Sequence, residues 1–148
     1  YQNFIDFFRE ERLLAQVKYA RSHQGFPGHI EKDLLTLCDN LEDLIPHESP
    51  ALLHGDLWAG NLIEATNGKP CLIDPAVYYG HREIDLAMTQ LFGGFDPVFF
   101  QYYEEEFPLE PGFQERKDLY NLYPLLIHFN LFGESYLNQV QQILKRFI

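Results

Sequence analysis

Apolar side chains recur at the spacing of amphipathic helices in the N-terminal part of the chain. A helix over residues 2–20 is predicted by one apolar face, which consists of Phe4, Ile5, Phe7, Phe8, Leu13, Leu14 and Val17. Two glycines and a proline at 25–28 interrupt this pattern. A second helix is predicted over residues 29–44, ending near Pro46, by the face Ile30, Leu34, Leu37, Leu41 and Leu44.

The pattern changes to short apolar runs in the middle of the chain. A run at 51–53 ends at His54-Gly55-Asp56, and the runs 62–65 and 70–73 flank Thr66-Asn67-Gly68-Lys69. Asn-Gly between two short apolar runs is a strong signal for a β-hairpin. Polar residues at the ends of these runs therefore lie at strand ends and in loops, where a rigid scaffold can present them.

Helical spacing returns after residue 80. The residues Ile84, Leu86, Ala87, Met88 and Leu91 predict a helix that Gly93-Gly94 ends. Asp96-Pro97 is typical of an N-cap followed by proline in the first turn, and it predicts a helix to about Phe107. Residues 113–148 are predicted to be mostly helical, with a break at 132–135. We therefore expect an α+β fold, mainly helical, with a small β-hairpin at its centre.

Three polar residues around the predicted hairpin have the spacing of a phosphoryl-transfer site. Phosphoryl transfer needs a carboxylate that accepts the proton of the attacking hydroxyl, and oxygen ligands that hold Mg²⁺ against the nucleotide phosphates. Protein kinases supply these groups as His-x-Asp, an Asn five residues later, and an Asp beyond a following turn. Here Asp56 is the candidate base, and Asn61 and Asp74 are the candidate metal ligands. The hairpin is expected to return Asp74 to the other two.

The alternative is that Asp56 and Asn61 only form turns beside glycine. A chance match of the four residue types that begins at His54 is of the order of 10⁻³ over the chain, if each type is about a twentieth of residues. The catalytic hypothesis is therefore favoured. His54 is expected to anchor the loop as a structural residue, and Gly55 and Gly60 to let it turn without a Cβ clash.

Composition narrows the class of protein further. The chain has 148 residues, is 46% hydrophobic and carries a net charge of -11, so it can build one core and is a poor partner for nucleic acid. No apolar run approaches 18 residues and no signal-peptide pattern begins the chain, so no membrane segment is expected. Cys38 and Cys71 lack metal-ligand spacing, and we interpret both as reduced and structural, in a cytoplasmic protein.

The amino-acid sequence around these residues resembles that of a known group of kinases. His-Gly-Asp-x-x-x-x-Asn with a later Asp looks like the aminoglycoside phosphotransferase and choline kinase group. The fuller segments at 54–61, 73–88 and 91–95, with those at 7–13 and 119–126, are similar to the fructosamine/ketosamine kinase family. The resemblance implies ATP- and Mg²⁺-dependent phosphorylation of ketosamines, free or protein-bound, at the sugar O3. It places the base on Asp56 and the metal ligands on Asn61 and Asp74.

Four further residues have an expected role, which for two of them is left open between two interpretations. Trp58 either stacks on a sugar ring or packs under the loop. The kinase resemblance assigns Asp85 a structural role, bracing the catalytic loop through backbone hydrogen bonds. Arg82 either pairs with a carboxylate or contacts substrate. His128 is expected to be a core histidine. Residues expected to border the cleft are Tyr78, Tyr79, His81, Arg82 and Glu83.

The resemblance implies that residues 1–148 are the C-terminal lobe of a protein-kinase-like fold, without the N-terminal nucleotide lobe. No Gly-rich strand–turn–strand and no strand-borne Lys precede Asp56. We expect the chain alone to be inactive or nearly so, and its exposed lobe face to favour self-association. Two rivals stay open. One is another small-molecule kinase, acting on an aminoglycoside-like or choline-like substrate, and the other is a non-catalytic binding module derived from the lobe.

Overall fold

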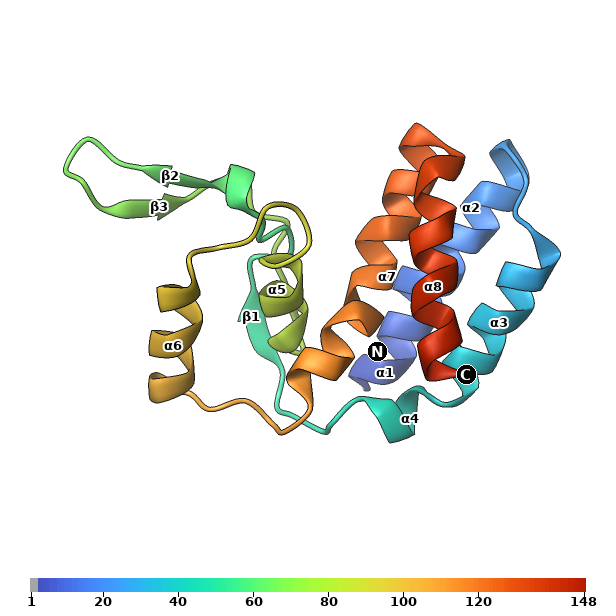
Figure 1. Cartoon of the computed structure of the whole chain (residues 1–148), viewed down its shortest axis with the longest axis horizontal. Helices are drawn as coiled ribbons and strands as arrows, with labels where there is room; N and C mark the ends of the chain where they lie inside the picture. The colour runs from blue at the N-terminus through green and yellow to red at the C-terminus, as the bar shows by residue number, and fades with distance from the viewer. Residues whose placement is uncertain (1–2) are drawn as a thin grey trace. The chain divides into compact units, whose positions relative to one another are not determined.

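The computed structural model describes residues 3–148, and the chain divides into two compact units. The first unit contains the chain through His47 and again from Asn121 to Ile148, and the second unit is Glu48–Tyr120. Helix α7 contributes residues to both units (Figure 1). The predicted fold class, α+β with mainly helical content and a small hairpin, is confirmed.

The first unit is helical throughout. Its elements are α1 Phe4–Phe7, η1 Phe8–Leu14, α2 Ala15–His23, α3 Gly28–Asp39, α4 Leu41–Leu44, the second part of α7 Phe113–Phe132, η3 Glu134–Tyr136 and α8 Leu137–Phe147. Their apolar faces meet in a core that includes Phe8, Leu13, Leu34, Leu37, Leu122, Leu125, Leu126, Phe129, Val140 and Leu144. None of the helices in residues 3–148 is long and apolar enough to cross a membrane.

The first predicted helix is helical but not uniform. Its predicted start at residue 2 lies outside the described residues, and its middle, η1, is a π-helix rather than an α-helix. A π-turn brings residues five apart to the same face. The Arg12 guanidinium accordingly lies 4.7 Å from the ring centre of Phe7, and it lies 4.8 Å from that of Tyr123. The spacing of apolar residues alone does not distinguish this π-helix from an α-helix.

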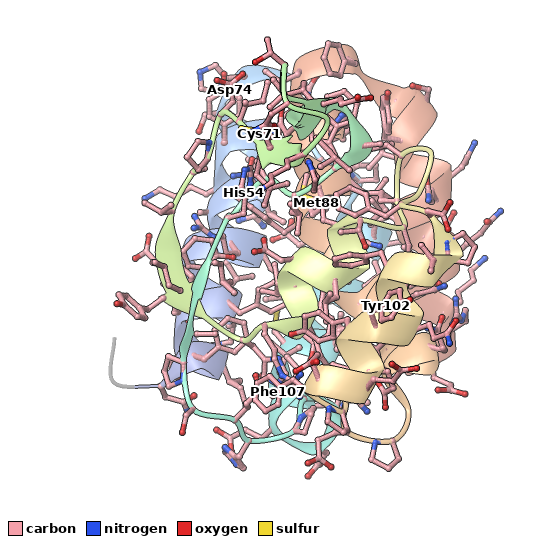
Figure 2. All side chains as sticks on the ribbon, turned by 90° about the vertical axis from the view of Figure 1, so that its left-hand side faces the viewer. His54, Cys71, Asp74, Met88, Tyr102 and Phe107 are labelled. Carbon is pink, nitrogen blue, oxygen red and sulfur yellow. The ribbon has the colours of Figure 1, made fainter. Side chains whose placement is uncertain are left out.

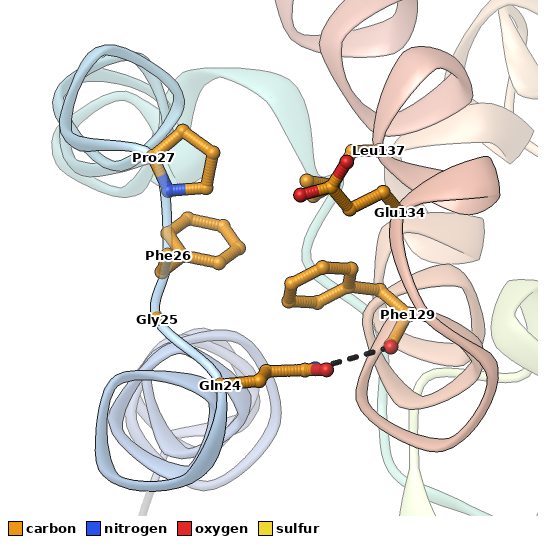
Figure 3. Close-up of a pocket in the computed structure, with 7 residues that line it drawn as sticks. All are labelled: Gln24, Gly25, Phe26, Pro27, Phe129, Glu134 and Leu137. Carbon is orange, nitrogen blue, oxygen red and sulfur yellow. Dashed lines mark hydrogen bonds between the residues drawn. The ribbon is translucent and has the colours of Figure 1, made fainter.

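The second predicted helix is split, because Asn40 leaves helical geometry between α3 and α4. The predicted break before α3 is confirmed, and it forms one side of a pocket of about 200 Å³ (Figure 3). Among the residues that line the pocket, Gln24 donates from Nε2 to the Phe129 carbonyl over 3.2 Å. The ring of Phe26 meets that of Phe129 edge-on, at 5.6 Å between centroids.

The second predicted break, after α7, is also confirmed. Gly133 has a φ of 90°, a value that favours glycine, and it separates α7 from η3. The expectation that His128 is a core residue is wrong, because its side chain is only half-buried. Its ring lies 5.5 Å from that of Phe132 and 5.1 Å from that of Tyr136, and its Nδ1 is 2.7 Å from the Pro124 carbonyl.

The second unit contains all four strands. The predicted hairpin is confirmed as β2 Leu62–Glu64 and β3 Pro70–Leu72, which pair antiparallel (Figure 1). The predicted run at 51–53 is strand β1, Ala51–Leu53. Its antiparallel partner, β4 Tyr78–Gly80, was not predicted from the sequence. Three residues are too few to show an alternating pattern.

The remaining helices of this unit are η2 Ala59–Asn61, α5, α6 and the first part of α7. Helix α5, Glu83–Met88, ends earlier than predicted, and Thr89 closes it by donating from its hydroxyl to the Leu86 carbonyl over 2.6 Å. Helix α6, Pro97–Glu106, begins as predicted, because the Asp96 carboxylate accepts from the Val98 N–H over 2.9 Å.

The two cysteines differ in environment. Both are free thiols, as the interpretation of both as reduced predicts, and Cys38 is buried on α3 whereas Cys71 is exposed on β3. Burial raises the pKa of the Cys38 thiol to about 12, with nearby Arg9 opposing the shift. Because only the thiolate is nucleophilic, Cys38 is chemically protected.

This difference predicts two classes of thiol in the folded chain. A disulfide reagent such as dithionitrobenzoate should modify Cys71 rapidly, and Cys38 only after unfolding, when followed by absorbance. The variant Cys71→Ser should lose the fast phase and keep the slow one. Equal rates for both thiols in the folded chain would contradict the buried position of Cys38.

Candidate active site

The segment His54–Asn61, called here the catalytic loop, begins where strand β1 ends, and α5 holds its first two residues. The Asp85 carboxylate accepts from the His54 N–H over 2.6 Å and from the Gly55 N–H over 3.0 Å. Burial raises the pKa of Asp85, and the hydrogen bonds from these two amides oppose that shift. Both carboxylate oxygens are therefore committed to the backbone of the loop.

The His54 side chain connects the loop to the end of β3. Its Nε2 lies 3.0 Å from the Ile73 carbonyl, and its Nδ1 lies 3.3 Å from the Asp56 N–H. A neutral imidazole with its proton on Nε2 satisfies both contacts, since it donates to Ile73 and accepts from Asp56. The two ring nitrogens of His54 are thus both used inside the protein.

Two glycines shape the loop for different reasons. Gly55 has a φ of 82°, and a Cβ on it would lie 2.1 Å from the Ala76 carbonyl oxygen, so no other residue fits this turn. The expectation that Gly60 avoids a Cβ clash is confirmed, because a Cβ there would lie 2.3 Å from the ring of Trp58. The indole rests on Gly60 while 38% of Trp58 stays exposed. Trp58 therefore packs against the loop and also presents surface to solvent.

Asp56 and Asn61 contact each other directly. The Asn61 amide nitrogen donates to the Asp56 backbone carbonyl over 2.8 Å and to its Oδ2 over 2.9 Å. Asn61 is only 6% exposed, so this orientation is enforced by its surroundings. With the amide nitrogen committed, the amide oxygen of Asn61 is the group left to bind a ligand. The same contact fixes the carboxylate of Asp56.

Asp74 lies between two points of backbone attachment to the loop. On one side, Ile73 donates from its N–H to the Asn61 carbonyl over 3.0 Å, and on the other, Ala76 donates to the His54 carbonyl over 2.8 Å. Figure 2 shows Asp74 beyond the end of β3, on the segment next to His54. Asp74 itself is exposed and has a φ of 52°, the single positive φ among non-glycine residues in 3–148. Such strain is often found at functional sites.

The donor set suits magnesium better than a transition metal. Among residues 3–148 no group of three or more His, Cys, Asp and Glu side chains is arranged to bind a metal. Asn61 and Asp74 instead offer hard oxygen donors from an amide and a carboxylate. Magnesium is usually bound through one or two carboxylates, with the remaining ligands coming from water and substrate phosphates. Two protein donors therefore fit Mg²⁺ held against a nucleotide.

Arg82 is a structural residue in this geometry. Its Nε donates to Glu48 over 2.7 Å, and its other nitrogens donate to the carbonyls of Phe107 over 2.8 Å and Pro108 over 2.7 Å. The guanidinium also lies 3.7 Å from the ring centre of Phe107. Of the two interpretations, pairing with a carboxylate is confirmed, and every guanidinium nitrogen has a protein acceptor.

Glu83 is more deeply buried than its expected position at a cleft border allows, at 1% exposed. Arg116 donates to both of its oxygens, over 2.6 and 3.0 Å, and the Tyr120 hydroxyl donates to it over 2.8 Å. The expectation that His81, Arg82 and Glu83 border a cleft is therefore wrong, because all three are buried. Glu48, Arg116 and Tyr120 were not predicted to contribute, because no sequence motif marks them.

The comparisons with known proteins agree with this geometry. Residues 1–148 match the sequence family described as fructosamine kinase. A probable ketoamine kinase of Synechocystis is 49% identical over 97% of this chain and 48% of its own length. A chloroplastic protein-ribulosamine 3-kinase of Arabidopsis thaliana is 38% identical over 99% of this chain and 45% of its own length. The chain thus spans about half the length of the curated relatives it matches.

Solved structures give the same result. A crystal structure of a candidate fructosamine-3-kinase from Thermobifida fusca has a TM-score of 0.87 and 34% identity, over 97% of this chain and 50% of that one. A second candidate, from Haemophilus somnus, has a TM-score of 0.82 and 30% identity, over 100% of this chain and 50% of that one. By sequence and by fold, the chain belongs to the fructosamine kinase family, as the sequence around His54 and Asp74 indicates.

Proposed function

We propose that this chain supplies the base and the metal ligands of a kinase that transfers phosphate from ATP to the sugar hydroxyl of a ketosamine. The observation that carries the proposal is the contact between Asp56 and Asn61. It holds a carboxylate in place to accept a proton, and because it uses the amide nitrogen of Asn61 it leaves the amide oxygen to bind a ligand. Relatives named ketoamine kinase and protein-ribulosamine 3-kinase support the choice of substrate class.

In the proposed mechanism Asp56 accepts the proton of the attacking sugar hydroxyl through the oxygen that Asn61 does not occupy. Asn61 and Asp74 would hold Mg²⁺, which would neutralise the charge of the nucleotide phosphates. Asp85 positions the catalytic loop by accepting hydrogen bonds from its backbone, and His54 positions it by contacting the Ile73 carbonyl. Trp58 offers the exposed part of its indole to the face of a sugar ring, a contact in which aromatic side chains are effective.

We further propose that the residues which hold the nucleotide lie outside residues 1–148, as the N-terminal lobe of the kinase. Kinases of this type place a phosphate-binding lysine on a strand. In the described part of the chain the lysines lie on helices or in the hairpin turn: Lys18, Lys32, Lys69, Lys117 and Lys145. We therefore expect residues 1–148 alone to turn over poorly or not at all.

The test is ATP-dependent phosphorylation of a fructosyl-lysine derivative by the full-length protein that carries this chain, with the product identified by mass spectrometry. An aminoglycoside and choline serve as competing substrates. Phosphorylation of the ketosamine alone supports the proposal, whereas turnover of choline or the aminoglycoside alone overturns the substrate class. If none is phosphorylated although Mg²⁺-ATP binds, the chain is a binding module.

Binding can be followed without a label, because Trp58 is the single tryptophan of the chain. Its position on the catalytic loop makes its fluorescence a local reporter. In the full-length protein we expect Mg²⁺-ATP to change the part of the tryptophan fluorescence that Trp58→Phe removes, and in residues 1–148 we expect it to leave the Trp58 signal nearly unchanged. Tight binding of Mg²⁺-ATP by residues 1–148 would contradict the proposal that another lobe holds the nucleotide.

Large apolar side chains are exposed on the hairpin, on β1 and at 77–79, and they are Leu52, Leu62, Ile63, Leu72, Val77 and Tyr79. Exposed apolar side chains commonly mark an interface where they lie together. We predict that residues 1–148 self-associate with rising concentration in sedimentation velocity. Leu72→Ser with Val77→Ser should weaken the association, and a monomer at every accessible concentration would contradict the prediction.

A further inference from the structure

A long segment of the second unit contains acidic residues and no basic ones. Between Arg82 and Arg116 the sequence contains no Lys, Arg or His. The acidic residues of this segment that are exposed are Asp96, Glu104, Glu105, Glu106, Glu110 and Glu115. The two arginines that bracket it are bound to Glu48 and Glu83, so their charges are already neutralised inside the protein. The exposed surface of this segment is therefore negative throughout.

Helix α6 carries the centre of this segment, and none of its residues is buried. Its inner face is aromatic, with the rings of Phe99 and Tyr103 at 6.0 Å and those of Phe95 and Phe99 at 5.1 Å. Helical spacing puts a different set on the outer face. We define the α6 outer face as Val98, Tyr102, Glu105 and Glu106, of which Val98 is 47% and Tyr102 is 61% exposed.

This face is held rigidly. Asp96 caps the start of α6, and Arg82 binds its end through the Tyr103 hydroxyl, over 3.3 Å, and through the Phe107 carbonyl. Glu104 closes the last turn by accepting from the Leu109 N–H over 3.1 Å. A surface that is fixed before binding loses little conformational entropy when a partner docks.

We propose that the α6 outer face docks the lysine-rich polypeptide that carries the ketosamine, an inference that rests on the proposed function. Ketosamines on proteins form on amines, so their carriers present lysines near the modified residue. Carboxylates attract such a surface, and Tyr102 offers a ring face for an ammonium group. The relative named protein-ribulosamine 3-kinase acts, by its name, on sugars attached to protein.

Binding without catalysis is the first test. A fluorescently labelled, unglycated lysine-rich peptide is titrated with residues 1–148 and followed by anisotropy at low and high salt. We expect binding that weakens as salt rises, and a loss of about fivefold to tenfold in affinity for Tyr102→Ala with Glu105→Gln and Glu106→Gln. The matched control, Asp39→Asn with Asp43→Asn, removes the same charge from exposed positions of the other unit. An equal loss in both variants, or none in the α6 variant, would overturn the proposal.

Kinetics of the full-length protein are the second test. The α6 variant should raise KM for a glycated lysine-rich protein by about fivefold to tenfold and leave kcat unchanged. KM for free fructosyl-lysine should stay the same. A parallel rise in both KM values would place α6 at the sugar site and overturn the docking role. Absence of turnover by the wild type would refute the proposed function instead, while the anisotropy result stands independently.

Discussion

Replacing Asp56 with Asn in the full-length protein should lower kcat for a ketosamine by about 10²–10⁴-fold, the range that a general base contributes. Asparagine keeps the size of the side chain and an oxygen for the bond from Asn61, so the loop should stay folded. What it loses is the ability to accept the proton of the attacking hydroxyl. KM should therefore change much less than kcat.

The measurement is steady-state ADP release with ketosamine varied at saturating ATP. The control is Asp43→Asn, an exposed residue of the first unit, which should keep wild-type rates. The fluorescence response of Trp58 to Mg²⁺-ATP should be the same for Asp56→Asn and for wild type. Retention of the wild-type rate by Asp56→Asn would remove Asp56 from the role of base.

Replacing Arg116 with Met should destabilise the chain by about 3–5 kcal/mol, the usual cost of leaving one member of a buried ion pair without its partner. Glu83 is almost fully buried, and Arg116 supplies two of its three hydrogen bonds. Burial also raises the pKa of Tyr120, so its hydroxyl stays protonated and donates to Glu83, but it carries no charge to replace the guanidinium.

Urea unfolding followed by Trp58 fluorescence measures this effect in the second unit. The control is Arg21→Met, which breaks the exposed pair with Glu31 and should cost no more than about 1 kcal/mol. Combining Glu83→Leu with Arg116→Met should recover part of the loss, because no buried charge is then left unpaired. Equal effects of the Arg21 and Arg116 changes would show that the Glu83 site is open to water.

Much of the fold was predictable, because its main signals are local. The Asn67-Gly68 turn, the Asp96-Pro97 start of α6 and the break at Gly133 each depend on a few adjacent residues. The short strand β4 was missed because its pairing partner, β1, is distant in the sequence. The π-helix around Arg12 was missed because apolar spacing does not distinguish a π-helix from an α-helix.

The same division applies to the candidate site. Asp56, Asn61 and Asp74 were chosen from spacing, and the structure adds the hydrogen bond between Asp56 and Asn61 and the backbone bonds on either side of Asp74. The bonds of Arg82 to Glu48 and of Glu83 to Arg116 were not predictable, since each joins residues more than thirty positions apart with no motif in common. Burial therefore reversed the expectation for Arg82 and Glu83, which sequence position had placed at a cleft.

The hydrogen bonds from His54 and Gly55 to Asp85 have a consequence for local unfolding. An amide proton exchanges with deuterium only when its hydrogen bond opens. These two protons can exchange only if the catalytic loop separates from α5, so their rates report that separation. Gly68, bonded within the exposed hairpin turn, should exchange far sooner. The catalytic loop should thus stay attached to α5, while the hairpin beside it opens and closes many times.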